Sequence, residues 1–201
     1  MANATVTATV ALPQPLQVPE PERIRLLGLA RVAIAVAVGA SPREALRLTL
    51  DAEPLPDRRA AAFVTLTEDG ELRGCMGTLD DDSPAWSSVV DTAEWAARGD
   101  PRFAPVRPSE LPRIHIDVSI LGPMVRLADP LAMRPGIDGI VVRAGGRRGL
   151  LLPEVADMLG GGATGMLDAC CRKAGLRARA WTEPGTEVWA FRTHRFGGPA
   201  A

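Results

Sequence analysis

Cysteine is scarce in this 201-residue chain, and its few thiols are not spaced for cross-links or metal binding. Only three cysteines occur, and two of them, Cys170 and Cys171, are neighbours. Their number and placement exclude a disulfide scaffold and a zinc ribbon, and no histidine or cysteine pair beside them completes a metal site. So few cysteines fit a reducing compartment. We therefore predict a cytoplasmic protein and expect neither a metal nor a cofactor.

The chain also lacks a surplus of positive charge and a long hydrophobic run. Its 23 basic and 24 acidic side chains give a net charge of −1, which argues against nucleic-acid binding. The longest apolar stretch, Leu26 to Ala40, contains Arg31 and is shorter than the ~20 residues of a membrane span. No basic residue precedes Arg23, which argues against a secretory signal. We therefore expect neither nucleic acid nor a membrane as a partner.

Composition indicates a folded domain behind a short tail. Hydrophobic residues make up 46% of the chain and charged residues 23%, which is ordinary for a globular protein. The first 19 residues instead alternate small, β-branched and proline residues without apolar periodicity. We therefore predict a flexible tail over residues 1–19 and a domain over residues 20–201.

Apolar periodicity, with glycine and proline at segment ends, predicts groups of helices and hairpins. Helices are expected over residues 21–38, 42–50, 84–98 and 164–174, and strands over residues 61–67, 71–75, 113–121, 138–142, 147–152 and 187–196. Asp69-Gly70 is typical of a hairpin turn. The elements come in runs rather than in a regular β-α-β alternation, which favours an α+β fold.

The segment from Arg73 to Thr78, RGCMGT, is the most informative part of the sequence. Its cysteine lies at the end of a predicted strand between two glycines, which permit unusual backbone angles and let a ligand approach the main chain. Arg73, two residues before the thiol, would favour the reactive thiolate. These features predict Cys75 and Arg73 as catalytic residues. A small buried cysteine in a tight hairpin is the alternative.

The same segment resembles the Arg-Gly-Cys-Ile-Gly signature of the AMMECR1 family, with Met76 in the place of isoleucine. This family supplies the protein-A component of the AmmeMemoRadiSam system. The resemblance covers about residues 22–196 and includes further matches in the same order. These are Phe63–Leu66, Asp100–Phe103, Ser119–Leu121, Gly136–Gly139, Leu151–Pro153 and Lys173–Leu176.

The resemblance implies an α+β fold with a mixed or antiparallel sheet, flanking helices and two unequal lobes that form a cleft. The Cys75 segment would face that cleft. The resemblance also implies a genomic link to a radical-SAM protein and to a Memo protein, the latter related to extradiol dioxygenases, but it specifies no reaction. The chain departs from the family at Glu154, usually a glutamine, and at residues 160–163, which lack the usual tryptophan. These changes would reshape one wall of the cleft.

Arg102 is a second candidate for binding an anion. Asp100 and Pro101 predict a turn, and Phe103 would anchor that turn in the core. Arg102 would then bind a substrate carboxylate or phosphate through two hydrogen bonds. Alternatively, it pairs with a nearby Asp or Glu and holds the turn. The predicted substrate-binding residues are Gly74, Gly77, Thr78 and Arg102.

Two other groups of reactive side chains have structural explanations. His115, Asp117 and Ser119 share one strand face, but side chains at i and i+2 stand parallel about 6.7 Å apart. That spacing is too long for the hydrogen-bonded relay of a catalytic triad, so a solvated strand face is expected. Cys170 and Cys171 fall on an apolar helix stripe and are expected in the core.

Nearly all basic residues are arginines, and Lys173 is the single lysine. This bias is typical of coding drift, with anion binding as the alternative. Arg143, Arg147 and Arg148 flank a glycine turn. They are expected at a solvated hairpin tip, with a small anion site as the alternative.

Two functions from different classes fit these residues. The first is a cysteine-dependent enzyme acting on a small acidic metabolite, in a biosynthetic pathway with radical-SAM or Memo-type partners. Cys75 would act as nucleophile or acid/base, with Arg73 and Arg102 as anion-binding partners. The alternative is a non-catalytic module whose cleft docks a partner protein or carries an intermediate. We favour the enzyme, because a glycine-flanked thiol beside arginine suits chemistry better than packing.

Overall fold

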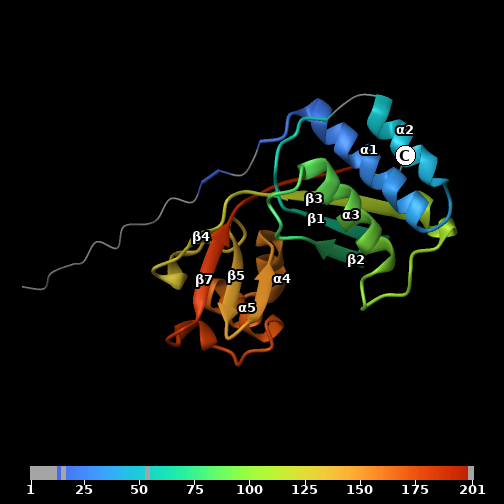
Figure 1. Ribbon diagram of the computed structural model, residues 1–201. Coiled ribbons are helices and arrows are strands. Elements are labelled where there is room, and N and C mark those ends of the chain that lie inside the picture. The colour runs from blue at the N-terminus through green and yellow to red at the C-terminus, as the bar shows by residue number, and fades with distance from the viewer. Residues whose placement is uncertain (1–12, 15–16, 53–54, 199–201) are drawn as a thin grey trace, which may run out of the picture. The chain divides into compact units, whose positions relative to one another are not determined.

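The structure is a computed structural model that describes residues 13–14, 17–52 and 55–198 (Figure 1). The chain divides into two compact units. The major unit is built from residues 17–52, 55–121 and 194–198. The minor unit is built from residues 122–193, together with the described residues 13–14. The major unit is therefore discontinuous in sequence, and it contains every residue of the predicted site.

A four-stranded sheet forms the centre of the major unit. Its strands are β1 (Ala62–Glu68), β2 (Glu71–Gly77), β3 (Ile114–Leu121) and β8 (Thr193–Gly198), in the order β2-β1-β3-β8. β1 pairs antiparallel with both β2 and β3. The helices of this unit are α1 (Glu20–Ala37), α2 (Arg43–Ala52) and α3 (Ala85–Arg98). α1 and α3 pack on each other and on the sheet (Figure 1).

Side-chain alternation along β1 and β3 explains why the helices cover only one face of this sheet. Val64 and Leu66 of β1 and Ile116 of β3 are buried in the core beneath the helices. The residues between them point to the opposite face, and Thr65 there is half-buried. This second face carries Cys75.

The minor unit has a second four-stranded sheet, in the order β4-β7-β5-β6. Helix α5 packs on one face of it, and its Cys170 and Cys171 are buried there, as their helical spacing predicts. The elements are β4 (Val125–Arg126), β5 (Gly139–Ala144), β6 (Arg147–Leu151), β7 (Glu187–Phe191), α4 (Ala156–Leu159) and α5 (Gly162–Lys173). Short 3-10 helices lie at Pro130–Ala132, Pro153–Val155 and Ala180–Thr182 in this unit, and another lies at Pro108–Arg113 in the major unit.

Helices combined with two antiparallel sheets confirm the α+β fold predicted from the sequence. Apart from the last strand, the predicted helices and strands are present, with ends displaced by a few residues. Within the described ranges, no helix has both the length and the apolar character needed to cross a membrane. The cleft implied by the family resemblance stays a prediction.

The last predicted strand, residues 187–196, is wrong as a single element, because the structure has two strands in two different sheets. β7 ends at Phe191, and β8 begins at Thr193 after a break at Arg192. Nε of Arg192 lies 3.4 Å from Oδ1 of the buried Asp138. The sequence pattern hides this break, because no glycine or proline separates the two segments.

Most of the predicted flexible tail, residues 1–19, lies outside the described residues. Val18 is described, and it departs from that prediction. Its side chain is 3% exposed in the core of the major unit, and its N–H donates to Nδ1 of His194 at 2.9 Å. The chain therefore joins the core before α1 begins.

Candidate functional site

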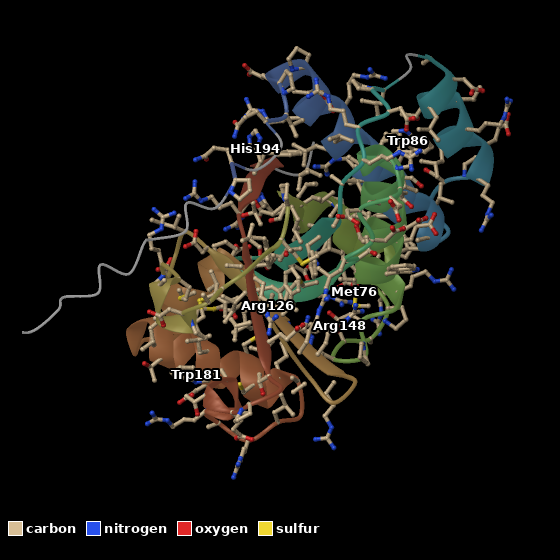
Figure 2. The ribbon with its side chains drawn as sticks, turned by 60° about the vertical axis from the view of Figure 1, so that its left-hand side comes forward. Met76, Trp86, Arg126, Arg148, Trp181 and His194 are labelled. Atoms are coloured by element: carbon tan, nitrogen blue, oxygen red, sulfur yellow. The ribbon has the colours of Figure 1, made fainter. Side chains whose placement is uncertain are left out.

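The β1–β2 hairpin places Cys75 on the sheet face opposite the helices. Its turn is Asp69-Gly70, and both residues have positive φ, 53° and 85°, as a tight two-residue hairpin turn requires. Cys75 itself is half-buried. The next residue, Met76, labelled in Figure 2, packs against the core on the other side of the strand. The thiol is thus held at the surface of the sheet rather than in the core.

A β-bulge decides which way Cys75 points. The pairing register of the hairpin shifts by one residue between Leu66 and Thr67. Arg73 is the extra residue on β2, without a partner on β1, and beyond it Cys75 lies opposite Thr65. A shift of one residue exchanges the two faces of a strand. The bulge therefore moves Cys75 away from the helix-covered face.

Three neighbours hold Cys75 in place. The hydroxyl of Thr65 donates to Sγ of Cys75 across the hairpin, with an Oγ1–Sγ distance of 3.2 Å. The backbone N–H of Cys75 donates to Oδ2 of Asp100 at 2.9 Å. Its carbonyl accepts from Nη2 of Arg102 at 3.4 Å. Side-chain and backbone contacts together fix the position of the sulfur.

Asp100 is the centre of this arrangement. Its side chain is only 2% exposed, and it accepts hydrogen bonds from the backbone N–H groups of Cys75 and Arg102, at 2.9 and 3.1 Å. Nε and Nη2 of Arg102 bind the same carboxylate at 2.9 and 2.7 Å. The Arg102 guanidinium, helped by the two N–H groups and opposed by burial, lowers the pKa of Asp100 to about 2. Asp100 is therefore a buried carboxylate that stays ionised.

Arg102 makes its bidentate pair with Asp100 of its own turn, the alternative that the sequence left open. Its side chain nevertheless remains 55% exposed and lies over the ring of Phe103, 5.4 Å from the centroid. Hydrogen bonding to Asp100 raises the pKa of Arg102, and the nearby Cys75 contributes in the same direction. Arg102 therefore contacts Cys75 through the backbone carbonyl of that residue.

Arg73 turns away from the sulfur toward the loop before β3. Its Nε and Nη2 bind the carboxylate of Glu110 at 2.7 and 3.3 Å. Its Nη1 and Nη2 donate to the carbonyl oxygens of Ala104 and Pro105 at 2.9 and 3.3 Å. The ion pair with Arg73 lowers the pKa of Glu110. Arg73 is thus bound to Glu110 and to two carbonyls of this loop, and its predicted role beside the thiolate stays a prediction.

The two positions on either side of Cys75, Gly74 and Gly77, have no room for a larger residue, because neighbouring groups lie against them. A Cβ on Gly74 would stand 2.2 Å from the carbonyl oxygen of Ala96 in α3. A Cβ on Gly77 would stand 2.2 Å from the ring of Phe63. Neither glycine adopts the left-handed backbone conformation. Close packing of the hairpin, rather than an unusual backbone angle, therefore accounts for both.

Thr78 and the aspartates after it order the loop that follows β2. The hydroxyl oxygen of Thr78 accepts from the backbone N–H of Asp80 at 3.0 Å. The carboxylate of Asp80 in turn accepts from the N–H of Asp82 and from the hydroxyl of Ser83. Asp80, Asp81 and Asp82 are exposed, with one ligand oxygen of each within 4.8 Å of the others. The oxygens of Asp80 already bind the loop itself, and exposed acidic groups are common without a bound ion, so the cluster gives no reason to expect a metal.

His115, Asp117 and Ser119 do not form a relay. Oδ2 of Asp117 lies 3.1 Å from Nη2 of Arg195 and 3.8 Å from Nε2 of His115. Ser119 is 3% exposed. The expected solvated face therefore fits His115 but not Ser119. Asp117 forms an ion pair with Arg195 on this sheet.

Brief labelling of the native protein with iodoacetamide is expected to modify Cys75 before Cys170 or Cys171. Cys75 is half-buried, whereas the other two are 0% exposed. Burial raises the pKa of Cys170 to about 12 and also raises that of Cys171. Mass-spectrometric peptide mapping measures the order of labelling. Equal or faster modification of Cys170 or Cys171 would contradict the burial of these two side chains on α5.

Sequence reasoning missed two residues of this site, Thr65 and Asp100. Thr65 was overlooked because its place opposite Cys75 depends on the bulge. From the sequence, Asp100 is expected only as a turn residue. The carboxylate of an aspartate in an Asp-Pro-Arg turn can, however, accept hydrogen bonds from both the arginine and a neighbouring strand. The motif at residues 100–103 and the motif at residues 73–78 are therefore one hydrogen-bonded unit.

Comparisons with known proteins agree on one family. A family model described as AMMECR1 matches residues 27–196. A protein of Methanothermobacter thermautotrophicus is 41% identical over 157 residues, which are 75% of this chain and 82% of that protein. Protein MK0488 of Methanopyrus kandleri is 40% identical over 157 residues, 72% of this chain and 76% of MK0488.

The fold has a match among solved structures as well. The crystal structure of protein PH0010 from Pyrococcus horikoshii is similar with a TM-score of 0.76 and 30% sequence identity. The similarity covers 86% of this chain and 89% of that chain. The family model spans the whole Cys75 site and most of the two units. The chain belongs to the AMMECR1 family.

Proposed function

We propose that this chain is a cysteine-dependent enzyme acting on a small acidic metabolite, with Cys75 as nucleophile or acid/base. One observation carries the proposal: a half-buried thiol accepts a hydrogen bond from Thr65, and its backbone is bound by the exposed Arg102. A hydrogen bond donated to the ionised form of a group favours that form. The thiolate is the nucleophilic form of cysteine.

Arg102 is the proposed contact for the acidic group of the substrate. Its hydrogen bonds to Asp100 and to the carbonyl of Cys75 use Nε and Nη2. Within the described part of the chain, Nη1 is left for a carboxylate or a developing oxyanion. Asp100 fixes the guanidinium in advance, so that little side-chain entropy is lost on binding.

The other predicted residues support Cys75 in this proposal. Gly74 and Gly77 let α3 and Phe63 pack against the strand, and Thr78 orders the loop after it. Arg73 fixes the loop that leads into β3. The proposed setting is a cytoplasmic biosynthetic pathway with a radical-SAM or Memo-type partner protein. That setting is supported by the family resemblance and the low cysteine content alone.

A non-catalytic binding module is the second candidate, and one observation favours it. Arg73, Gly74, Asp100 and Glu110 are all engaged in holding the hairpin, the turn and the loop together. A motif built for rigidity equally suits a surface that docks a partner protein. The two candidates differ in whether Cys75 and Arg102 act together on an anion.

Arg102→Gln is expected to remove a preference of Cys75 for a negatively charged electrophile. The labelling rate of Cys75 is measured with iodoacetate, which carries a carboxylate, and with neutral iodoacetamide. An exposed ion pair contributes up to about 1 kcal/mol, so the iodoacetate-to-iodoacetamide rate ratio should fall by up to roughly fivefold. Changes in the exposure or ionisation of the thiol affect both reagents and cancel in this ratio.

Two further variants control this experiment. Arg43→Gln removes one exposed arginine from α2 and should leave the ratio unchanged. Arg102→Lys keeps the charge and should retain most of the preference. A ratio that is the same in wild type and Arg102→Gln would leave Arg102 as a turn residue only. The binding module would then be the better account of this site.

A further inference from the structure

We propose that the β5–β6 hairpin of the minor unit binds a small phosphorylated molecule. The hairpin turns at Gly145-Gly146 and carries Arg143, Arg147 and Arg148, the last labelled in Figure 2. These three arginines and Glu187 line a hollow of about 350 Å³. The inference uses no residue of the Cys75 site and does not depend on the proposed enzyme function.

The strand register brings like charges together at this point. Arg143 and Arg148 occupy directly opposite positions of β5 and β6, an arrangement that destabilises a sheet. On its other side Arg143 lies opposite Glu187. That carboxylate accepts the indole N–H of Trp189 at 3.2 Å and lies 3.4 Å from Nη2 of Arg126. The hairpin therefore keeps an unfavourable pair of cations that a bound anion would neutralise.

Arg143 and Arg147 contact neutral groups. The guanidinium carbon of Arg143 lies 5.4 Å from the ring centroid of Trp189, a cation–π contact. Nη1 of Arg147 donates to the carbonyl of Gly175 at 2.6 Å, just beyond α5. Arg148 is exposed. Over the residues that the structure describes, neither Arg143 nor Arg148 forms an ion pair, so both charges are available to a ligand.

A phosphate group fits this pair of arginines best. Guanidinium groups bind phosphate oxygens through two parallel hydrogen bonds each, and a phosphate has enough oxygens for two arginines at once. The turn glycines leave the hollow open, because a Cβ on Gly145 or Gly146 would meet nothing within 4 Å. The volume of the hollow lies at the lower end of the range usual for small-molecule sites. These features favour a phosphomonoester or diphosphate of small size.

Isothermal titration of the full chain with inorganic pyrophosphate, in a phosphate-free buffer of fixed ionic strength, tests the proposal. Wild type should bind with a saturable one-to-one isotherm. The double variant Arg143→Gln with Arg148→Gln should bind at least roughly tenfold more weakly, since each lost guanidinium removes charge-assisted hydrogen bonds. Arg148→Gln alone should show part of this loss. It changes only an exposed side chain, so its melting temperature should match wild type.

Arg177→Gln is the matched control, because Arg177 is also an exposed arginine of the minor unit, paired with Glu183. Its affinity for pyrophosphate should stay within about twofold of wild type. No saturable binding to wild type, or an equal loss in Arg177→Gln, would overturn the proposal and leave a solvated hairpin tip. Binding to phosphatidic-acid vesicles or to a duplex oligonucleotide, but not to pyrophosphate, would also overturn it.

Discussion

Gly74→Ala is expected to lower the free energy of unfolding by about 2–4 kcal/mol. The new Cβ would stand 2.2 Å from the carbonyl oxygen of Ala96 and 3.2 Å from its carbonyl carbon. Both neighbours are backbone atoms of α3, so no flexible side chain can rotate away. The hairpin or the helix must shift, and overpacking of this kind costs ~1–3 kcal/mol or more. Urea unfolding followed by circular dichroism measures the loss.

Two other glycines provide the controls for this prediction. At Gly77 the obstacle is the ring of Phe63, a side chain that can move, so Gly77→Ala should cost less than Gly74→Ala. At Gly28, inside α1, a Cβ would meet nothing within 4 Å. Gly28→Ala should therefore stabilise the protein by about 0.5–1 kcal/mol through helix propensity. Near-wild-type stability of Gly74→Ala would contradict the close approach of α3 to β2.

Asp100→Ala is expected to lower the free energy of unfolding by about 3 kcal/mol. The carboxylate accepts four hydrogen bonds, two from backbone N–H groups and two from the Arg102 guanidinium. Hydrogen bonds to charged groups contribute ~1.5–3 kcal/mol each. Arg102 is 55% exposed and can regain water, which limits the total. The N–H of Cys75 loses its acceptor in the variant.

The same carboxylate predicts how stability depends on pH. The pKa of Asp100 is lowered from 3.8 to about 2 in the folded protein. Its contribution to stability is therefore complete above about pH 4 and is lost as the pH falls toward 2. The difference in unfolding free energy between wild type and Asp100→Ala should shrink over that interval. A difference that stays constant from pH 5 to about pH 2 would contradict the ionised buried carboxylate.

Two asparagine variants complete the test. Asp100→Asn keeps the shape of the side chain but leaves one acceptor oxygen, so it should retain only part of the stability. Asp91→Asn changes an exposed carboxylate on α3 and should cost nothing. Equal losses in both would mean that charge, rather than the Asp100 contacts, sets the stability.

The positions of the helices and strands could be predicted because local patterns determine them. Gly39 follows α1 with a φ of 77°, a conformation suited to glycine beyond a helix end. Along β3, Ile114, Ile116 and Val118 alternate with polar residues and are all buried. The break between β7 and β8 could not be predicted, because alternation is the same in one long strand and in two.

The direction of Cys75 could not be predicted, because it depends on one extra residue in a strand. With regular pairing from the Asp69-Gly70 turn, Cys75 would lie opposite Val64, a core residue, and would be buried. The bulge at Arg73 instead places it opposite Thr65. The sequence alone thus allowed both the reactive and the buried cysteine.

The partners of the two arginines needed the tertiary structure. From the sequence, Arg73 is expected beside the thiol, because residues at i and i+2 share a strand face. The bulge breaks that rule, and Glu110, far along the chain, binds Arg73 instead. For Arg102, the structure shows a bidentate pair with Asp100, two residues away, and its predicted role in binding a substrate anion stays a prediction.

The place of β8 in the major sheet sets an order for folding during synthesis. β8 covers the edge of β3, yet the ribosome makes it only after all of residues 122–192. Until then the nascent sheet has an open edge that can pair with other chains. The N–H of Gly122 donates to the carbonyl of Arg192 at 2.8 Å, so folding of the intervening residues brings the start of β8 back to the end of β3. Once these intervening residues have folded, β8 can pair with β3 by closing a short loop instead of a long one. The entropic barrier to that pairing is therefore lower.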